Sequence, residues 1–387
     1  MGRGRGRPAH VGDVAPGMRQ LRAPVLASFM VPAVGVVLLA LTWNAKPPAA
    51  VSIMLALVHV ALVTVAVAHA EAIAHRVGEP FGTLILAVAV TVIEVSLIVT
   101  LMAAEGPAGS TLARDSVFAV IMIVCNGVVG ASILLDARRD HIVRFNEQGA
   151  NALLGTVVTI AVLSLVMPTF TESTEGATFT PSQLAFSAIS AAVVYAVFVF
   201  VQTTRHRWMF LSPEALEIES AEQGGHLVPH APREGRAESL VLRGVMLAVS
   251  LVGVVGLAKT LAPSIRDAVE WAGAPQSFVG VVIALMILLP ESVAALRASA
   301  RGEMQTSLNL SLGSALASIG LTIPVIAVAS IWIDGPVTLG LGGKEIVLLA
   351  LTTVISMLTF GSGRATILQG VQHLAVFAAF MFLAVVP

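Results

Sequence analysis

The chain has 387 residues, of which 56% are hydrophobic and only 12% are charged, and its mean hydropathy is +0.90. A soluble globular domain carries roughly 25% charged residues, so this composition predicts an integral membrane protein. The net charge of −1 gives no support for a nucleic-acid partner, and a single cysteine excludes a disulfide within the chain.

The N-terminal segment 1–23 is basic and rich in Gly, and we expect it to be a cytoplasmic tail. The apolar span after it is too long for the core of a cleaved signal peptide and lacks a small-residue cleavage site at its end. A run of about 20 apolar residues crosses the bilayer core as a helix. This criterion predicts an all-α polytopic membrane protein with eleven transmembrane helices, near residues 24–43, 50–70, 81–104, 116–135, 150–168, 181–202, 239–261, 277–298, 305–331, 345–362 and 365–386.

The loop charges predict the orientation, because Lys and Arg accumulate on the cytoplasmic side of a membrane protein. With the N-terminus inside, most of the 22 Lys and Arg residues fall in cytoplasmic segments. The external segments then keep only Lys46, Arg114, Lys259, Arg266 and Lys344. We therefore expect a bacterial inner-membrane protein with a cytoplasmic N-terminus and a periplasmic C-terminus.

The polar segment 203–238 divides the expected spans into six and five, and we interpret it as a flexible cytoplasmic linker. When the extra N-terminal helix 24–43 is set aside, five spans remain in 50–202 and five in 239–387. An odd number of helices makes the two halves enter the membrane in opposite directions, which is the inverted-repeat plan of many secondary transporters. The sequence thus predicts two inverted five-helix repeats.

Two glutamates lie at corresponding points of these repeats. Glu94 is in the third span, in VTVIEVSL, and Glu291 is in the eighth, in LLPESVAA. They are the only acidic residues well inside any expected span, and both fall near the bilayer midplane. A pseudo-two-fold axis in the membrane plane would bring the two carboxylates together.

A charged side chain at mid-bilayer costs at least ~2.5–3.5 kcal/mol, so it is retained where it has a partner or a function. A structural ion pair or a protonated glutamate is one explanation, but no basic residue lies at comparable depth in the sequence. Two such carboxylates repel each other, and either protons or a metal cation can remove this repulsion. Ca²⁺ takes oxygen ligands of this kind. Because proton and cation exclude each other at one site, the pair predicts exchange.

The neighbouring helix supplies neutral oxygens. Hydroxyl residues recur on one face of the span 305–331, and Asn309 lies beside them; the stripe consists of Ser307, Ser311, Ser314, Ser318 and Thr322. Hydroxyls that bond back to their own helix would explain any single one of them. Pro290, directly before Glu291, predicts a kinked or partly unwound helix. A second set on the tenth span has no carboxylate and is interpreted as packing: Thr352, Ser356 and Thr359.

Four segments carry a family resemblance, namely 68–102, 290–298, 308–325 and 361–380. They resemble the bacterial ChaA-type calcium/proton and sodium or potassium/proton antiporters of the cation/calcium exchanger superfamily. The run HRVGEPFGTLIL, which leads to EVSLI, is long enough to be specific. The tail and the linker fall outside the resemblance.

The resemblance implies an eleven-helix exchanger in which Glu94 and Glu291 form a shared cation and proton site and act as the metal ligands. It further implies an amide ligand at Asn126, a second-repeat counterpart at Ser318, and Ser314 in the Gly-Ser pair of that helix. The chain departs from many relatives by carrying Val90 and Thr91 in place of Gly-Asn, and Leu288 where an Asn is expected. Fewer amide ligands leave the preference for calcium over monovalent cations open.

Four residues lead into the third span and are candidates for a cytoplasmic vestibule: His69, Glu71, His75 and Glu79. They would attract cations or pass protons, since His titrates near neutral pH. A solvated helix end explains them equally well.

The leading hypothesis is a proton-coupled antiporter that exchanges cytoplasmic Ca²⁺, and also Na⁺ or K⁺, for external H⁺. A Na⁺ or K⁺/H⁺ antiporter with little Ca²⁺ activity is the alternative, and a cation channel with a carboxylate filter is a weaker one. No cofactor is expected beyond the transported ions, and membrane lipid is the expected partner. An intramembrane enzyme is disfavoured because the chain lacks H-E-x-x-H and G-x-S-x-G motifs.

Overall fold

The computed structural model describes residues 22–43, 45, 47–77, 89, 91–92, 94–100, 102, 109–139, 141–211, 240–275, 277–332 and 336–386. The expected tail up to residue 21, most of the expected linker and much of the third expected span lie outside these residues. The described part of the chain is almost entirely helical, as the composition predicts.

The helices begin and end close to the predicted span limits. The first group comprises α1 (Arg22–Thr42), α2 (Ala49–Val77), α4 (Leu112–Met122), the π-helix η2 (Ile123–Val128), α5 (Val129–Asp136), α6 (Glu147–Ala161), the π-helix η3 (Val162–Val166), α7 (Met167–Phe170), α8 (Pro181–Phe200), the π-helix η4 (Val201–Arg205) and the 3₁₀ helix η5 (Arg207–Phe210). The second group comprises α10 (Leu240–Trp271), α11 (Ser277–Ala300), α12 (Met304–Ala329), α13 (Gly343–Phe360) and α14 (Ile367–Val385). Two short strands, β1 (Val143–Arg144) and β2 (Arg364–Ala365), complete the fold.

Side-chain caps fix several helix starts. The Asn146 carboxamide accepts hydrogen bonds from the backbone nitrogens of Gln148 and Gly149 at the start of α6. Thr180 and Gln183 form a capping box at the start of α8, where Pro181 occupies the first turn. These local signals explain why apolar runs of similar composition become separate helices.

Eight helices in the described part of the chain are long and apolar enough to cross a membrane, and α11 makes a ninth if its two bent halves are one span. Each expected span except the third coincides with a helix. Two helices extend beyond their expected ends: α2 continues to Val77 and α10 to Trp271. The all-helical membrane architecture is therefore confirmed, and the full count of eleven stays a prediction.

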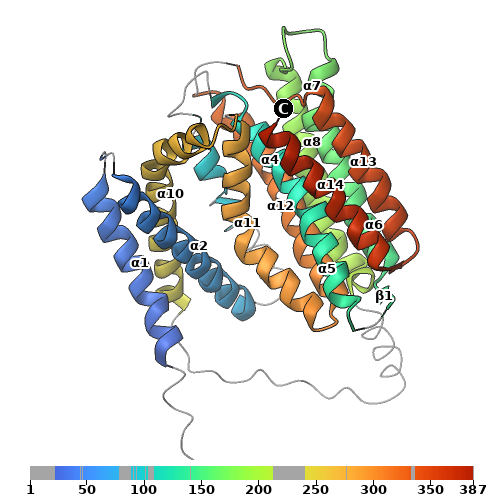
Figure 1. Cartoon of the computed structure of the whole chain (residues 1–387), viewed down its shortest axis with the longest axis horizontal. Coiled ribbons are helices and arrows are strands. Elements are labelled where there is room, and N and C mark those ends of the chain that lie inside the picture. Colours follow the sequence, from blue (N-terminus) through green and yellow to red (C-terminus); the bar gives the residue numbers. More distant parts are fainter. Residues whose placement is uncertain are drawn as a thin grey trace, which may run out of the picture.

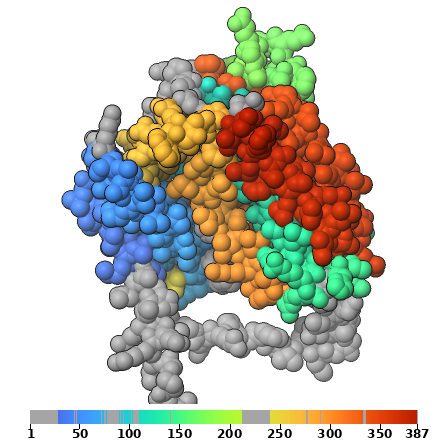
Figure 2. Space-filling view, viewed as in Figure 1, coloured from blue at the N-terminus to red at the C-terminus, as the bar shows by residue number. Residues whose placement is uncertain are grey.

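The helices pack in two groups (Figure 1). α1, α2 and α10 share a small hydrophobic core that includes Leu39, Leu62 and Leu257. A larger core joins α4 to α8 with α11 to α14. Figure 2 shows α1, α2 and α10 on one side of the molecule, α11 in the middle, and α13 and α14 on the other side.

Large apolar side chains remain exposed on the outer faces of α8, α13 and α14, where they suit contact with lipid; among them are Phe186, Ile189, Val354, Leu358, Leu368 and Phe382. The four tryptophans are exposed and lie at or just beyond helix ends: Trp43, Trp208, Trp271 and Trp332. This is the position in which an indole meets the lipid headgroups.

The two ends of the helix bundle are tied by different loops. At the linker end, which is where η5 ends and α10 begins, β1 pairs antiparallel with β2. At the opposite end, which holds α7 and the C-terminus in Figure 1, Thr178 forms a β-bridge with Thr338.

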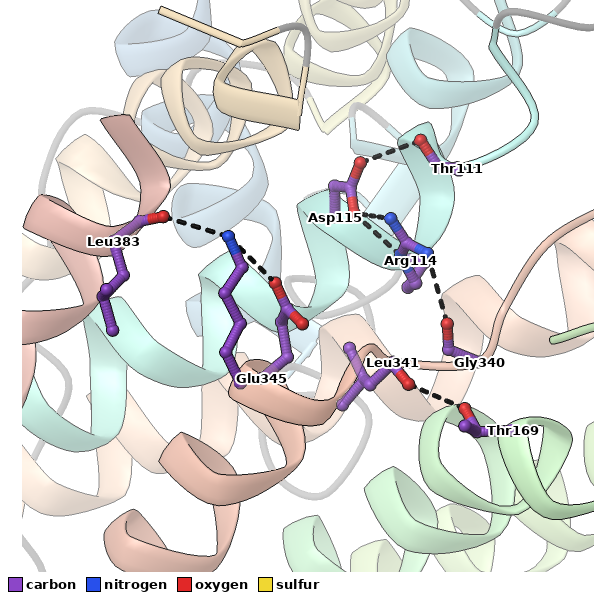
Figure 3. A network of polar contacts seen from close by, with 9 residues as sticks. Thr111, Arg114, Asp115, Thr169, Gly340, Leu341, Glu345 and Leu383 are labelled. Carbon is purple, nitrogen blue, oxygen red and sulfur yellow. Dashed lines mark hydrogen bonds and ion pairs between the residues drawn. The ribbon is translucent and has the colours of Figure 1, made fainter. Parts of the chain in front are cut away.

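At the opposite end of the bundle, hydrogen bonds fix the loop that precedes α13 (Figure 3). The Arg114 guanidinium donates to the Gly340 carbonyl at 3.2 Å, and the Thr169 hydroxyl donates to the Leu341 carbonyl at 2.7 Å. Arg114 also pairs with the Asp115 carboxylate at 2.8 Å. This end of the bundle is therefore held together by α4, α7 and the loop.

α11 bends by 55° between Leu289 and Glu291, which confirms the break predicted at Pro290. Its first half packs closely against the start of α4. A Cβ added at Gly280 would lie 2.9 Å from the Asp115 Cβ and 3.0 Å from the Ser116 backbone nitrogen. The absence of a side chain at this position thus sets how near the two helices lie.

We expect Gly280→Ala to destabilise the fold by about 1–3 kcal/mol, because backbone atoms of α4 must move to accept the methyl group. Thermal unfolding of the purified protein in detergent measures the change. Gly155→Ala is the matched control, since no atom lies within 4 Å of a Cβ there. It should leave stability unchanged or raise it by up to about 1 kcal/mol; equal effects of the two changes would contradict the packing argument.

Candidate functional site

A cavity of about 660 Å³ lies between α2, α8, α11 and α12, towards the linker end. Most of its lining is apolar, and its polar lining residues are Thr64, Thr91, Tyr195, Gln202, Glu291, Arg297, Arg301, Asn309, Ser314 and Ser318. At the opposite end, a cavity of only about 40 Å³ lies beside Asp115, Lys344 and Glu345. The larger of these two cavities therefore lies towards the linker end.

Glu291 lies on the wall of the cavity, directly after the bend of α11. Its side chain is half-buried, and both carboxylate oxygens are inaccessible to solvent. Further along the same helix, roughly 9 Å by helical rise, Arg297 lines the cavity nearer the linker end. Glu291 and Arg297 therefore lie on the same half of α11, after the bend.

Arg301 also lines the cavity at the linker end, and its charge is partly neutralised by a neighbouring carboxylate. The exposed Arg301 guanidinium donates two hydrogen bonds of 2.9 Å to the Glu303 carboxylate. These bonds lower the pKa of Glu303 from its ordinary value, so this carboxylate stays ionised at neutral pH. The entrance therefore carries charges of both signs.

Glu94 is almost fully buried, with 2% of its surface exposed, and its carboxylate accepts a 2.5 Å hydrogen bond from the Ser318 hydroxyl. Ser318 also lines the cavity that contains Glu291 and Ser314. The structure thus connects Glu94, through Ser318, to the wall that carries Glu291. Three of the five residues expected to bind the cation and proton thus line one cavity, and a fourth, Glu94, contacts it through Ser318.

The hydroxyl stripe of α12 divides into three parts. Ser314 and Ser318 face the cavity, as just described. The Ser311 hydroxyl donates to the Ser307 carbonyl, one turn earlier in α12, at 2.8 Å. This is a hydroxyl that bonds back to its own helix. Ser307 exchanges a 2.9 Å hydrogen bond with Ser132 on α5. The stripe therefore serves packing at its beginning and the cavity at its middle.

Asn126, the fifth expected residue, lies elsewhere. It is fully buried in the π-helix η2 and is absent from the lining of the 660 Å³ cavity. Its amide nitrogen donates to the Thr352 hydroxyl at 2.9 Å, and its amide oxygen lies 3.3 Å from His373 Nδ1. The side chain therefore contacts α13 and α14, and a π-helix is a local distortion that often accompanies functional positions.

His373 is the residue that the sequence interpretation missed. His373 is fully buried and its Nε2 also lies 3.1 Å from the Thr359 hydroxyl. One signal could have identified it, since a histidine in the middle of an apolar span marks a site that needs a partner. Thr352 and Thr359, interpreted as packing residues, belong to this polar network.

The expected vestibule is described only in part. His69 is buried, and its Nε2 lies 3.1 Å from the Ser28 backbone oxygen on α1. The side chains of Glu71 and His75, and residue Glu79 as a whole, lie outside the described residues. His69, whose side chain the structure describes, therefore contacts α1.

Within the described ranges, no three His, Cys, Asp or Glu residues come together as a metal cluster. The site offers two carboxylates, the hydroxyls of Ser314 and Ser318, and the Asn309 amide. Such an oxygen set can hold a hard cation that keeps some of its water, or it can hold protons on the carboxylates.

A family model described as sodium/calcium exchanger protein matches residues 47–204 and 243–386. A putative ionic transporter of Sinorhizobium fredii is 40% identical over 366 residues, which cover 94% of this chain and 96% of that protein. The sodium-potassium/proton antiporter ChaA of Escherichia coli is 35% identical over 315 residues, 81% of this chain and 83% of that protein. The regions that the family model matches exclude the tail and most of the linker.

Two solved structures share the fold. The native structure of YfkE covers 93% of this chain and 100% of its own, with a TM-score of 0.69 and 17% identity. The H⁺/Ca²⁺ exchanger CAX covers 94% of this chain and 89% of its own, with a TM-score of 0.68 and 12% identity. At these identities the likeness concerns the arrangement of the helices.

We expect Ser318→Ala to lower stability by about 1–3 kcal/mol, because the buried Glu94 carboxyl loses its hydrogen-bond donor. Ser311→Ala is the control on the same helix face, since that hydroxyl bonds only to carbonyls of its own helix, and it should cost less than about 1 kcal/mol. Thermal unfolding in one detergent compares the two. Equal losses would show that the Glu94 contact has no energetic importance.

Proposed function

The chain belongs to the sodium/calcium exchanger protein family, and we propose that it is a proton-coupled antiporter that exchanges cytoplasmic Ca²⁺ for external protons across the bacterial inner membrane. The observation that carries this proposal is the connection of Glu94, through Ser318, to the cavity wall that holds Glu291. The proteins that this chain matches are transporters, which agrees with a non-enzymatic role.

The chemistry of exchange follows from the two carboxylates. A cation entering the cavity meets Glu291 and the hydroxyls of Ser314 and Ser318, and it displaces the protons that the carboxyl groups hold. Protons arriving from the other side neutralise the same groups and release the cation. The Ser318 hydroxyl, now bonded to Glu94, can turn its oxygen towards the cation when that carboxylate becomes a ligand.

The loop pairing supports the two inverted repeats, 50–202 and 239–387. Under that plan, the loop holding β1 corresponds to the loop that precedes α13, and the loop holding β2 corresponds to the one between α7 and α8. The β1–β2 pair then has a counterpart in the bridge between Thr178 and Thr338. The two pairings lie at opposite ends of the bundle, as an axis in the membrane plane requires.

Helix packing gives the same relation. α8 and α14 are the last helices of the two proposed repeats. α8 packs against α12, and α14 packs against α5, which belongs to the counterpart of α12. α2 and α10, the first helices of the repeats, pack against each other. These reciprocal contacts, together with the extra helix α1, fit an eleven-helix exchanger with one N-terminal helix.

The cavity defines a direction for the proposal. It lies towards the linker end, and the sequence assigns that end to the cytoplasm because most of its Lys and Arg residues fall there. At the opposite end the Arg114 network and the close contact at Gly280 hold the described elements together. We therefore infer that the structure faces the cytoplasm and that its C-terminus is external. In this arrangement a cytoplasmic cation can enter the site, and protons can leave the site for the cytoplasm.

A Na⁺ or K⁺/H⁺ antiporter with little Ca²⁺ activity is the second candidate. A specific observation favours it: the Asn126 amide is bonded to α13 and α14, so the cavity offers fewer strong ligands to a divalent ion. The 35% identical relative is named a sodium-potassium/proton antiporter. Measurements with each cation separately distinguish the two candidates.

We expect Glu94→Gln and Glu291→Gln each to reduce cation-dependent proton movement to background, because a carboxamide can neither bind a proton for exchange nor balance the cation charge. Everted membrane vesicles carrying a pH-sensitive dye measure this with Ca²⁺, Na⁺ and K⁺ in separate runs. Glu270→Gln, at an exposed carboxylate near the end of α10, is the matched control and should retain wild-type exchange.

Detergent gel filtration of the same variants shows whether they remain folded. Full exchange in either folded glutamate variant would contradict the proposed site. A wild-type response to Na⁺ or K⁺ with none to Ca²⁺ would select the second candidate.

Competition between protons and cations predicts a pH dependence. The apparent KM for the cation should rise as the pH on the cavity side falls, by about tenfold per pH unit for one displaced proton and about a hundredfold for two. Uptake assays at a series of cytoplasmic pH values, at fixed external pH, measure the slope. A cation channel would give cation flux without proton movement, and its KM would not depend on pH.

A further inference from the structure

We propose that Arg297 is a specificity-determining residue: its charge on the cavity wall disfavours divalent cations relative to monovalent ones. This inference rests on the proposed function, because it requires cations to reach the carboxyl groups through the cavity of about 660 Å³. Arg297 acts through its electric field and is not a ligand. Its effect is to shift the preference of the site towards Na⁺ and K⁺.

Arg297 stands on the same wall as one of the two proposed exchange groups. It lies on the half of α11 that follows the 55° bend, and Glu291 begins that half. Both side chains line the cavity. Arg297 follows Glu291 by six residues, which is about 9 Å by helical rise towards the linker end. A cation that enters from the linker end therefore approaches Arg297 before it binds beside Glu291.

The charge of Arg297 is not compensated by a neighbouring acid. The charged residues of the described cavity lining are Glu291, Arg297 and Arg301. Arg301 donates two hydrogen bonds of 2.9 Å to the Glu303 carboxylate. Arg297 is exposed, and within the described ranges of the chain its guanidinium forms no ion pair. One full positive charge is therefore left on the wall of a cavity that cations must enter.

Helix-end stabilisation is the structural explanation for the same arginine. Arg297 lies in the last turn of α11, where a positive charge favours the negative end of the helix dipole. Cytoplasmic helix ends of membrane proteins also collect Lys and Arg. Neither role needs the side chain to line a cavity, and neither depends on the charge of the transported ion. The response to ion valence therefore distinguishes selectivity from helix-end stabilisation.

The size of the effect follows from Coulomb's law. In water, a unit charge about 9 Å away changes the affinity of a monovalent cation by about twofold. A divalent cation has twice the interaction energy, so its affinity changes by the square of that factor, about fivefold. The lining of the cavity is mostly apolar, and a lower dielectric constant raises both factors but keeps the square relation. That relation is the signature of a charge effect.

We expect Arg297→Gln to lower the apparent KM for Ca²⁺ by about fivefold or more, and the KM for Na⁺ and K⁺ by the square root of that factor, about twofold or more. Everted vesicles present the cytoplasmic side to the bath, so each KM is measured against the bath concentration of one cation. An alkaline bath keeps proton competition small. If Ca²⁺ is not transported, its inhibition constant against Na⁺ supplies the divalent value.

Two variants control for shape and for general surface charge. Arg297→Lys keeps the charge on a long stem and should keep each KM within about 1.5-fold of wild type, since Arg297 has no carboxylate partner that needs a planar fork. Arg138→Gln removes an equal charge just beyond the end of α5, at an exposed position outside the cavity lining. It should leave the ratio of the Ca²⁺ and Na⁺ constants unchanged. Thermal unfolding in detergent shows whether each variant is folded.

Ionic strength provides an independent test of the same charge effect. Salt screens an exposed charge, and the Debye length is about 10 Å at 0.1 M salt. The gain in Arg297→Gln should therefore shrink when tetramethylammonium chloride is added to the bath. A gain that does not change with ionic strength would contradict an electrostatic origin.

Three further results would overturn the proposal. Equal factors for Ca²⁺, Na⁺ and K⁺ in Arg297→Gln, or the same shift in Arg297→Lys, would show a change of shape and not of charge. Unchanged constants for all three cations would leave Arg297 with helix-end stabilisation only. A Ca²⁺-specific gain shared by Arg138→Gln would belong to the membrane surface in general. None of these results touches the exchange function, which fails only if the folded variants of Glu94 and Glu291 transport normally.

Discussion

The proposed exchange site depends on two carboxyl groups, those of Glu94 and Glu291, held among apolar helices. A buried carboxylate is costly, so the chain must supply either a proton or a cation, and a polar wall beside each group. The bend of α11 sets Glu291 on the cavity wall, and the Ser318 hydroxyl on α12 contacts Glu94. The sequence places no Lys or Arg at the same depth as these two glutamates.

In the proposed exchanger, a site that binds a cation from one side must be closed to the other side. The cavity of about 660 Å³ that Glu291 lines lies towards the linker end. At the opposite end, hydrogen bonds tie the loop before α13 to Arg114 on α4 and to Thr169 on α7 (Figure 3). Under the inverted-repeat proposal, reversing this asymmetry exposes the same carboxylates to the other side.

The sequence predicts the parts of this design that depend on local properties. Hydropathy locates the spans, the rarity of acids in them identifies Glu94 and Glu291, and Pro290 predicts the bend. It does not predict the surroundings of Asn126, because they depend on a π-helix and on partners more than 200 residues away, namely Thr352 and His373. Nor does it distinguish the hydroxyls of α12 that face the cavity from Ser311, since all of them share one helical face.

The polar residues inside the bundle therefore form two sets with different chemistry. The cavity set includes the Glu291 carboxyl group and, through Ser318, contacts that of Glu94, whereas the set around His373 consists of an amide, two hydroxyls and an imidazole within hydrogen-bond distance of one another. A neutral network costs little to bury because its groups satisfy one another.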